Sequence, residues 1–163
     1  MTEIFVVGER ADSSYSIDFE MDSFFFPIKL DTGAKYTVIS AGAFDDELTP
    51  EKLECIKSYC EDHVSRKEKF ISASGDPFWG YLAKVNSVRI GSTMFHDFMF
   101  YLVIENKRDI ALLGFDFIDK CKCLHEANGN FVLSQFDEFR YKQDQEKALN
   151  VNELVTFIDS LSD

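Results

Sequence analysis

The chain has few basic residues, few prolines and no long apolar run, and these shortages exclude several classes of protein. Seventeen lysines and arginines stand against 29 aspartates and glutamates, which gives a formal net charge of −12. Such a chain repels phosphate backbones and anionic lipid headgroups, so we expect neither nucleic acid nor a membrane surface as a partner. The longest apolar segment, 24–28, is followed by Lys29 and Asp31 and is too short to span a bilayer.

The beginning of the chain and its cysteines indicate a compartment. Residues 1–8 lack the basic segment, the long apolar core and the small-residue cleavage site of a signal peptide, so a cytoplasmic location is expected. In the cytoplasm, the four cysteines are most simply reduced thiols.

The apolar residues that are present are sufficient for one folded domain. Hydrophobic residues make up 45% of the chain, including 17 phenylalanines, and only three residues are proline. This composition excludes global disorder, because a chain of this length can bury enough apolar surface to offset its lost conformational entropy.

The apolar pattern predicts a mainly β protein with one or two helices. Alternation over 15–21, continuous apolar runs at 24–30 and 110–114, and turn signals at 74–77 and 128–130 are typical of short strands and hairpins. Two further strands are expected near 88–91 and 95–104. A helix is expected over about 49–65, where Thr49 and Pro50 start an amphipathic pattern.

The C-terminal segment differs in composition. We expect a folded domain over 1–136 and a polar extension over 137–163, in which a short helix could form near 152–161. The sequence leaves open whether the extension strengthens an assembly, covers a site or extends into solvent.

The most informative motif is Asp31-Thr32-Gly33-Ala34, which follows one apolar strand and precedes another. A carboxylate at the end of a buried strand suits proton transfer. Thr32 can brace the loop with its hydroxyl, Gly33 allows backbone that a β-carbon would forbid, and Ala34 leaves room above the carboxylate. The same residues are also common in ordinary turns.

A second motif further along the chain supports a functional interpretation of the first. Ala111-Leu112-Leu113-Gly114 is a short apolar run that ends in glycine, and a Gly/Pro-tipped hairpin at 70–85 lies between the two motifs. In this order the three features resemble the retropepsin-like aspartic proteases, over about residues 15–136. The resemblance implies a closed acid-protease β-barrel with a flap hairpin, the helix at 49–65 being an insertion.

The resemblance also implies a role for each site residue. Asp31 would be catalytic, with Thr32 and Gly33 completing the catalytic loop. Leu113 and Gly114 would support that loop from beneath. The substrate-binding residues would lie above the aspartate and in the flap, and they are Ala34, Ser74, Gly75, Phe78 and Trp79.

The chemistry of this family requires two carboxylates that share one proton, and this chain contains a single Asp-Thr-Gly. The second carboxylate would therefore be Asp31 of another copy in a twofold homodimer, acting on a peptide or protein substrate. No metal or organic cofactor is implied. Retroviral members often place arginine after the second-motif glycine to support the dimer, and Phe115 stands there in this chain.

Some of these residues also have a purely structural interpretation. Phe78 and Trp79 could be ordinary core residues. Cys121, Cys123 and His125 alternate along a strand, but they lack the common Cys-x2-Cys spacing of zinc sites, so we expect buried thiols. The alternative to a protease is a catalytically silent peptide-binding or dimerisation module on the same fold.

Overall fold

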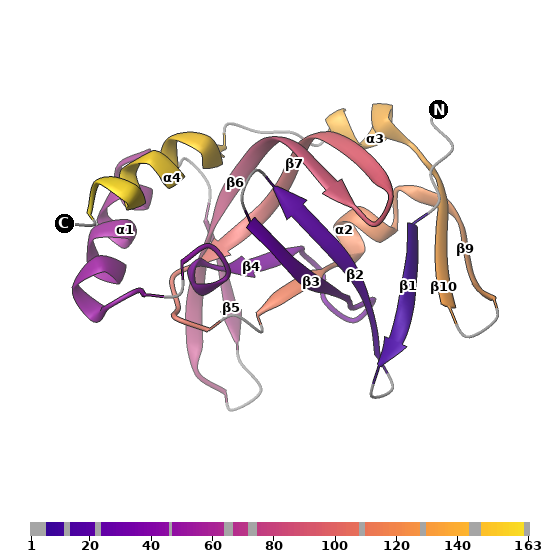
Figure 1. Ribbon diagram of the computed structural model, residues 1–163, viewed down its shortest axis with the longest axis horizontal. Helices are drawn as coiled ribbons and strands as arrows, with labels where there is room; N and C mark the ends of the chain where they lie inside the picture. Colours follow the sequence, from indigo (N-terminus) through magenta and orange to yellow (C-terminus); the bar gives the residue numbers. More distant parts are fainter. Residues whose placement is uncertain are drawn as a thin grey trace.

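Strands dominate the structure, which is a computed structural model (Figure 1). It describes residues 6–11, 14–21, 24–45, 47–63, 67–71, 75–107, 110–127, 130–143 and 148–161. The strands are β1 (Val6–Ala11), β2 (Ser14–Met21), β3 (Phe24–Leu30), β4 (Val38–Ser40), β5 (Lys67–Ile71), β6 (Pro77–Ile90), β7 (Thr93–Val103), β8 (Ala111–Leu113), β9 (Cys121–Ala127), β10 (Asn130–Phe136) and β11 (Leu149–Asn150). The helices are α1 (Pro50–His63), α2 (Phe115–Ile118), α3 (Glu138–Gln143) and α4 (Val151–Ser160), and a 3-10 turn, η1, spans Ala41–Ala43.

Six strands close into a barrel. Following the hydrogen-bonded neighbours, β6 is joined to β7, β4, β8, β3 and β2 in turn, and β2 pairs back with β6 through Phe19 and Ile90. Strands β1, β10 and β9 extend the sheet outward from β2, while β5 and β11 lie along β6. The mainly β fold class expected from the sequence is therefore confirmed.

Phenylalanine fills the barrel. Rings from separate strands and from α2 stack on one another, as with Phe19 on Phe26 (centroids 4.8 Å apart) and Phe117 of α2 on Phe136 of β10 (4.7 Å). Ile17, Phe19 and Met21 are all buried, because the alternation of β2 turns every second side chain into the core. This packing accounts for the high phenylalanine content of the sequence.

One expected strand boundary is wrong. The sequence suggested a separate strand at 88–91, but β6 continues without a break from Pro77 to Ile90 and pairs with β7 along most of its length. The chain reverses at Gly91, which has φ +64°. Glycine adopts this left-handed conformation without strain because it has no β-carbon.

Helix α1 lies where the sequence predicts it, beginning one residue after its cap. The Thr49 hydroxyl accepts a hydrogen bond from the Lys52 N–H at 3.2 Å, which is the expected N-terminal capping contact. Ile56 and Cys60 form the buried side of the helix, and Glu51, Glu54, Lys57 and Glu61 are exposed. None of the helices in the described part of the chain is long and apolar enough to cross a membrane.

The described part of the C-terminal extension packs onto the barrel. Strand β11 pairs in parallel with β6 at Leu149 and Ala83, and α4 lies beside α1, where Tyr59 and Phe157 stack with centroids 4.4 Å apart (Figure 1). Val151, Leu154 and Ile158 of α4 are buried. The short helix expected near 152–161 is present, and residues 148–161 share the core of the preceding residues; the division at 136 stays a prediction.

Leu154→Ala is expected to lower the free energy of unfolding by about 2–4 kcal/mol, because it leaves a cavity between α4 and the barrel. Thr156→Ala, on the exposed side of the same helix, should change it by less than about 0.5 kcal/mol. Urea denaturation of both variants measures the difference. Equal effects would show that α4 does not pack on the barrel.

Candidate active site

Asp31 stands at the end of β3, where a buried strand emerges into a loop. Its backbone N–H donates to the Leu113 carbonyl oxygen of β8 at 3.0 Å, and its carbonyl accepts from the Ala34 N–H at 3.1 Å in a tight turn. The Gly33 N–H donates to Asp31 Oδ1 at 3.0 Å and so orients the half-buried carboxylate. Thr32 and Gly33 are exposed, so the tip of this loop faces solvent in the single chain.

Gly33 does not adopt the backbone conformation for which a glycine was expected here. Its φ is not in the positive region, where Gly75 and Gly91 lie. Instead, a β-carbon on residue 33 would come within 3.3 Å of Asp31 Oδ1, which is closer than most contacts of a β-carbon. The glycine therefore keeps space beside the carboxylate.

Leu113 and Gly114 lie directly beneath the loop. Strand β8 sits between β3 and β4, so the loop of residues 31–37 that joins those two strands must cross over the end of β8. A β-carbon on Gly114 would lie 2.4 Å from the Tyr36 carbonyl carbon and oxygen. Only glycine fits, because backbone atoms on both sides cannot move apart cheaply.

Two backbone hydrogen bonds continue this support past Gly114. The Phe115 N–H donates to the Ala34 carbonyl at 2.8 Å, and the Asp116 N–H donates to the Lys35 carbonyl at 3.1 Å. The loop is thus held at Asp31, Ala34 and Lys35 by the segment 113–116. This is the arrangement that fixes the position of the carboxylate.

A buried network centred on Thr37 was not anticipated from the sequence. The Thr37 hydroxyl accepts from the Gly114 N–H at 3.1 Å and donates to Asp116 Oδ1 at 2.7 Å. The Thr37 N–H also donates to the Asp116 carboxylate, at 3.0 and 3.1 Å to its two oxygens, and the Phe117 N–H donates to Oδ1 at 2.8 Å. The signal that could have found Asp116 is a carboxylate set between two phenylalanines in an apolar run.

The environment of Asp116 changes its proton affinity. Burial raises the pKa of Asp116 above its ordinary value, and the hydrogen bonds from Thr37 and Phe117 only partly offset this effect. Asp116 points inward onto Thr37 and is not placed to meet a substrate; it holds the loop.

The β5–β6 hairpin is where the sequence places a flap. Residues 67–71 pair with 77–81 in antiparallel register, and Gly75 near the tip has φ +90° with open space around it. Ser74 lies outside the described residues. At the base, a β-carbon on Gly80 would lie 2.6 Å from the Phe70 ring, so this glycine lets that ring pack across the hairpin.

Phe78 and Trp79 differ in exposure and in the residues they contact. Phe78 is half-buried and stacks on Phe70 with ring centroids 5.5 Å apart. Trp79 is 45% exposed, and the Lys67 ammonium lies 4.9 Å from its ring centroid.

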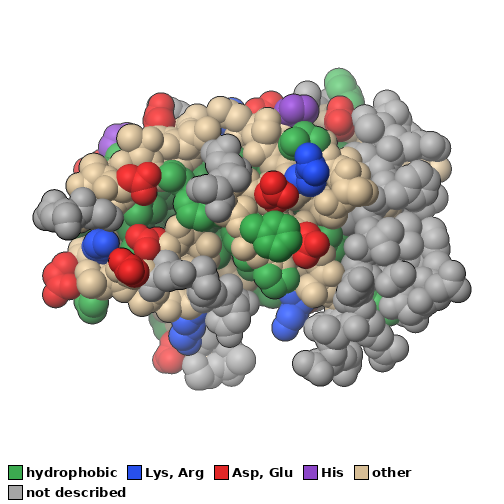
Figure 2. All heavy atoms as spheres, in the orientation of Figure 1, with side chains coloured by type: hydrophobic (Ala, Val, Ile, Leu, Met, Phe, Trp, Pro, Cys, Tyr) green, Lys and Arg blue, Asp and Glu red, His purple; other side chains and the backbone are tan. Residues whose placement is uncertain are grey.

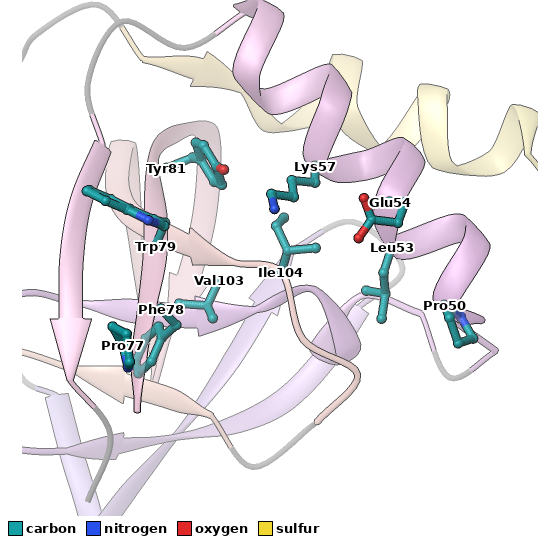
Figure 3. A pocket seen from close by; sticks show the side chains of 10 residues that line it. All are labelled: Pro50, Leu53, Glu54, Lys57, Pro77, Phe78, Trp79, Tyr81, Val103 and Ile104. Carbon is teal, nitrogen blue, oxygen red and sulfur yellow. The ribbon is translucent and has the colours of Figure 1, made fainter. Parts of the chain in front are cut away.

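Both residues line a cavity of about 380 Å³ between β6 and α1, together with Leu53, Glu54 and Lys57 of the helix (Figure 3). Residues 31–37 do not line this cavity. The role of Phe78 and Trp79 in contacting substrate stays a prediction.

Helix α1 is tied to the same hairpin by a polar chain. The buried Tyr81 hydroxyl donates to Glu61 Oε1, and Glu61 Oε2 lies 3.5 Å from the Lys67 ammonium. The hydrogen bond from Tyr81 lowers the pKa of Glu61, and burial raises that of Tyr81. The expected insertion is thereby linked to the base of the hairpin.

The cysteine side chains that the structure describes do not form a metal site. Burial raises the pKa of both Cys60 and Cys121 to about 12, so these thiols are protonated at neutral pH and are poor ligands and nucleophiles. Within the described residues, no group of three metal-binding side chains comes together. The side chains of Cys123 and His125 lie outside the described residues.

Comparisons with known proteins identify the class of fold. The sequence matches no protein-family profile and no curated protein. Among solved structures, the fold is similar to that of a retropepsin-like aspartic protease from Rickettsia conorii, with a TM-score of 0.52 and 18% sequence identity. The match covers 82% of this chain and 90% of that chain. The protein therefore has a retropepsin-like fold, while its activity must be argued from the site.

Thr37→Val is expected to lower the free energy of unfolding by about 1–3 kcal/mol, because it leaves the buried Gly114 N–H without its acceptor and removes a donor to Asp116. Thr37→Ser keeps the hydroxyl and loses one methyl group, so we expect about 1 kcal/mol or less. Chemical denaturation distinguishes the two, and a larger loss in the serine variant would contradict the network.

Asp116→Asn should change how stability depends on pH. Because the folded-state pKa of Asp116 is raised, its favourable contribution is complete below the ordinary aspartate pKa and is lost as pH rises through the folded value. The free energy of unfolding of wild type minus that of Asp116→Asn should therefore fall as pH rises from about 4 toward 7. Asp159→Asn, on α4, controls for the loss of one charge, and a flat difference for Asp116→Asn would refute the assignment.

Proposed function

We propose that this protein is an aspartic endopeptidase in which Asp31 is the catalytic carboxylate. The observation that carries the proposal is the loop itself. Asp31 is oriented by the Gly33 N–H and braced by the segment 113–116, on a fold shared with a retropepsin-like protease. The half-buried carboxylate is held in one position next to an exposed loop tip, and a fixed position of this kind is what a reacting group needs.

The proposed active unit is a homodimer. The sequence contains one Asp-Thr-Gly, and the reaction needs two carboxylates. A twofold axis beside the loop would place Asp31 opposite its symmetry mate, and the exposed Thr32 and Gly33 would then lie in the interface. In this proposal, a single chain is inactive.

The chemistry follows from two carboxylates that cannot both ionise at contact distance. The ionised member takes a proton from a water molecule, whose oxygen attacks the peptide carbonyl carbon. The protonated member gives its proton to the carbonyl oxygen, forming a tetrahedral diol. When the C–N bond breaks, the amine nitrogen takes the proton of the protonated member and one diol hydroxyl gives its proton to the ionised member, so the fragments leave as acid and amine and the pair again holds one proton.

The β5–β6 hairpin is proposed as the flap. An extended peptide beneath it would bind by main-chain hydrogen bonds, with alternate side chains in pockets. Ala34, Ser74 and Gly75 would contact its backbone, and Phe78 and Trp79 its side chains. Closure over the substrate would exclude bulk solvent from the site while keeping the attacking water molecule between the two carboxylates.

Asp31→Asn should abolish cleavage of a diverse peptide mixture between about pH 4 and 7, since the amide cannot take the proton from water. The rate should fall by at least about 10²–10⁴-fold. Mass spectrometry of the products measures cleavage, and sedimentation velocity checks that wild type and variant are equally dimeric. Cleavage by both proteins would show that another group, or a contaminant, does the chemistry.

The same variant distinguishes an enzyme from a silent binding module. Trp79 is the only tryptophan in the chain and lies on β6 of the hairpin, so its fluorescence reports peptide binding there. Under the proposal, Asp31→Asn still binds a cleavable peptide but does not turn it over. A dimeric wild type that binds peptides and cleaves none would establish the binding module instead.

A further inference from the structure

Phe115 is a large apolar side chain exposed beside the catalytic loop. It is 47% exposed, although it directly follows two buried residues, Leu113 and Gly114. Its N–H is bonded to the Ala34 carbonyl, so its backbone is joined to the turn that contains Asp31. Phe115 and the exposed loop tip at Thr32 and Gly33 are thus parts of one hydrogen-bonded unit.

A single exposed phenylalanine is ordinary, but the backbone that carries Phe115 is anchored on both sides. The residues after it are anchored: Asp116 is bonded to Thr37, and Phe117 and Ile118 are buried in the core. Little conformational freedom of the backbone remains to be lost when the ring is covered, and this is the property of a good contact residue.

We propose that Phe115 makes the apolar contact that joins two copies of this chain across the twofold axis. The inference rests on the proposed function, because that function brings Asp31 up to its mate and so brings the attached Phe115 to the same interface. In a twofold interface each contact occurs twice, so two rings would be covered per dimer. The occupant of this surface is a second copy, since the site is incomplete without one.

The net charge of the chain predicts how dimerisation depends on salt. Each copy carries −12, so a dimer carries twice that, −24, and long-range repulsion opposes association. The face in Figure 2 shows acidic side chains spread among apolar ones. Salt screens this repulsion and leaves an apolar contact intact, so the dimer should tighten as salt rises; an interface held by ion pairs would weaken.

The test measures the dimer dissociation constant by sedimentation velocity for wild type, Phe115→Glu and Phe139→Glu, at about 0.05 and 0.5 M NaCl. Phe139 is the matched control, a 72% exposed phenylalanine on α3. Phe115→Glu should raise the dissociation constant by roughly 100-fold or more, and Phe139→Glu by less than about threefold. Phe115→Ala, which adds no charge, should raise it by roughly tenfold.

The outcomes separate this inference from the proposed function. If Phe115→Glu and Phe115→Ala dimerise like wild type, or if wild type is monomeric, the inference is wrong, whatever the activity. If Phe115→Glu is monomeric with unchanged circular dichroism, and wild type dimerises but cleaves no peptide, the contact stands and the protease proposal fails. Loss of cleavage in Phe115→Glu, with recovery at high protein concentration, supports both.

Discussion

The position of β8 between β3 and β4 constrains everything else at the site. Because β3 and β4 are consecutive in the chain but are separated by β8, the loop joining them must cross the end of that strand. The crossing brings Asp31, Ala34 and Lys35 onto residues 113–116, and it leaves no room for a β-carbon at Gly114. The same crossing buries the Thr37 hydroxyl, which needs Asp116 as a partner. The carboxylate is thus positioned by topology, from segments about 80 residues apart.

The chain adds its own features to this common arrangement. Helix α1 packs beside α4 and is joined to the β5–β6 hairpin through Glu61 and Tyr81, so the hairpin base does not stand alone. The cavity between α1 and β6 is lined by Phe78 and Trp79 of the hairpin and by residues of α1, and residues 31–37 do not line it. Within the hairpin, Tyr81 is buried, whereas Trp79 is half-exposed.

Much of the fold could be predicted because the relevant signals are local. The alternation of β2, the Thr49 cap of α1 and the paired motifs at 31–34 and 111–114 each lie within a few residues. The sequence was wrong or silent where the deciding contact is distant. The continuity of β6, which it missed, depends on pairing with β7. The packing of the C-terminal residues, which it left open, depends on contacts of α4 with β6 and on the stacking of Phe157 on Tyr59. Neither strand period nor composition reports such contacts.

By itself, the sequence determined that the chain is mainly β, which strands flank Asp31 and that one Asp-Thr-Gly is present, because these follow from the order and period of side chains. Only the tertiary structure decided what holds the carboxylate in place. Thr37 and Asp116 are unremarkable in the sequence, and Phe115 is one of 17 phenylalanines. They acquire their roles because the barrel closes and brings residues 113–117 against residues 31–37, where burial makes each polar atom need a partner and leaves one ring without cover.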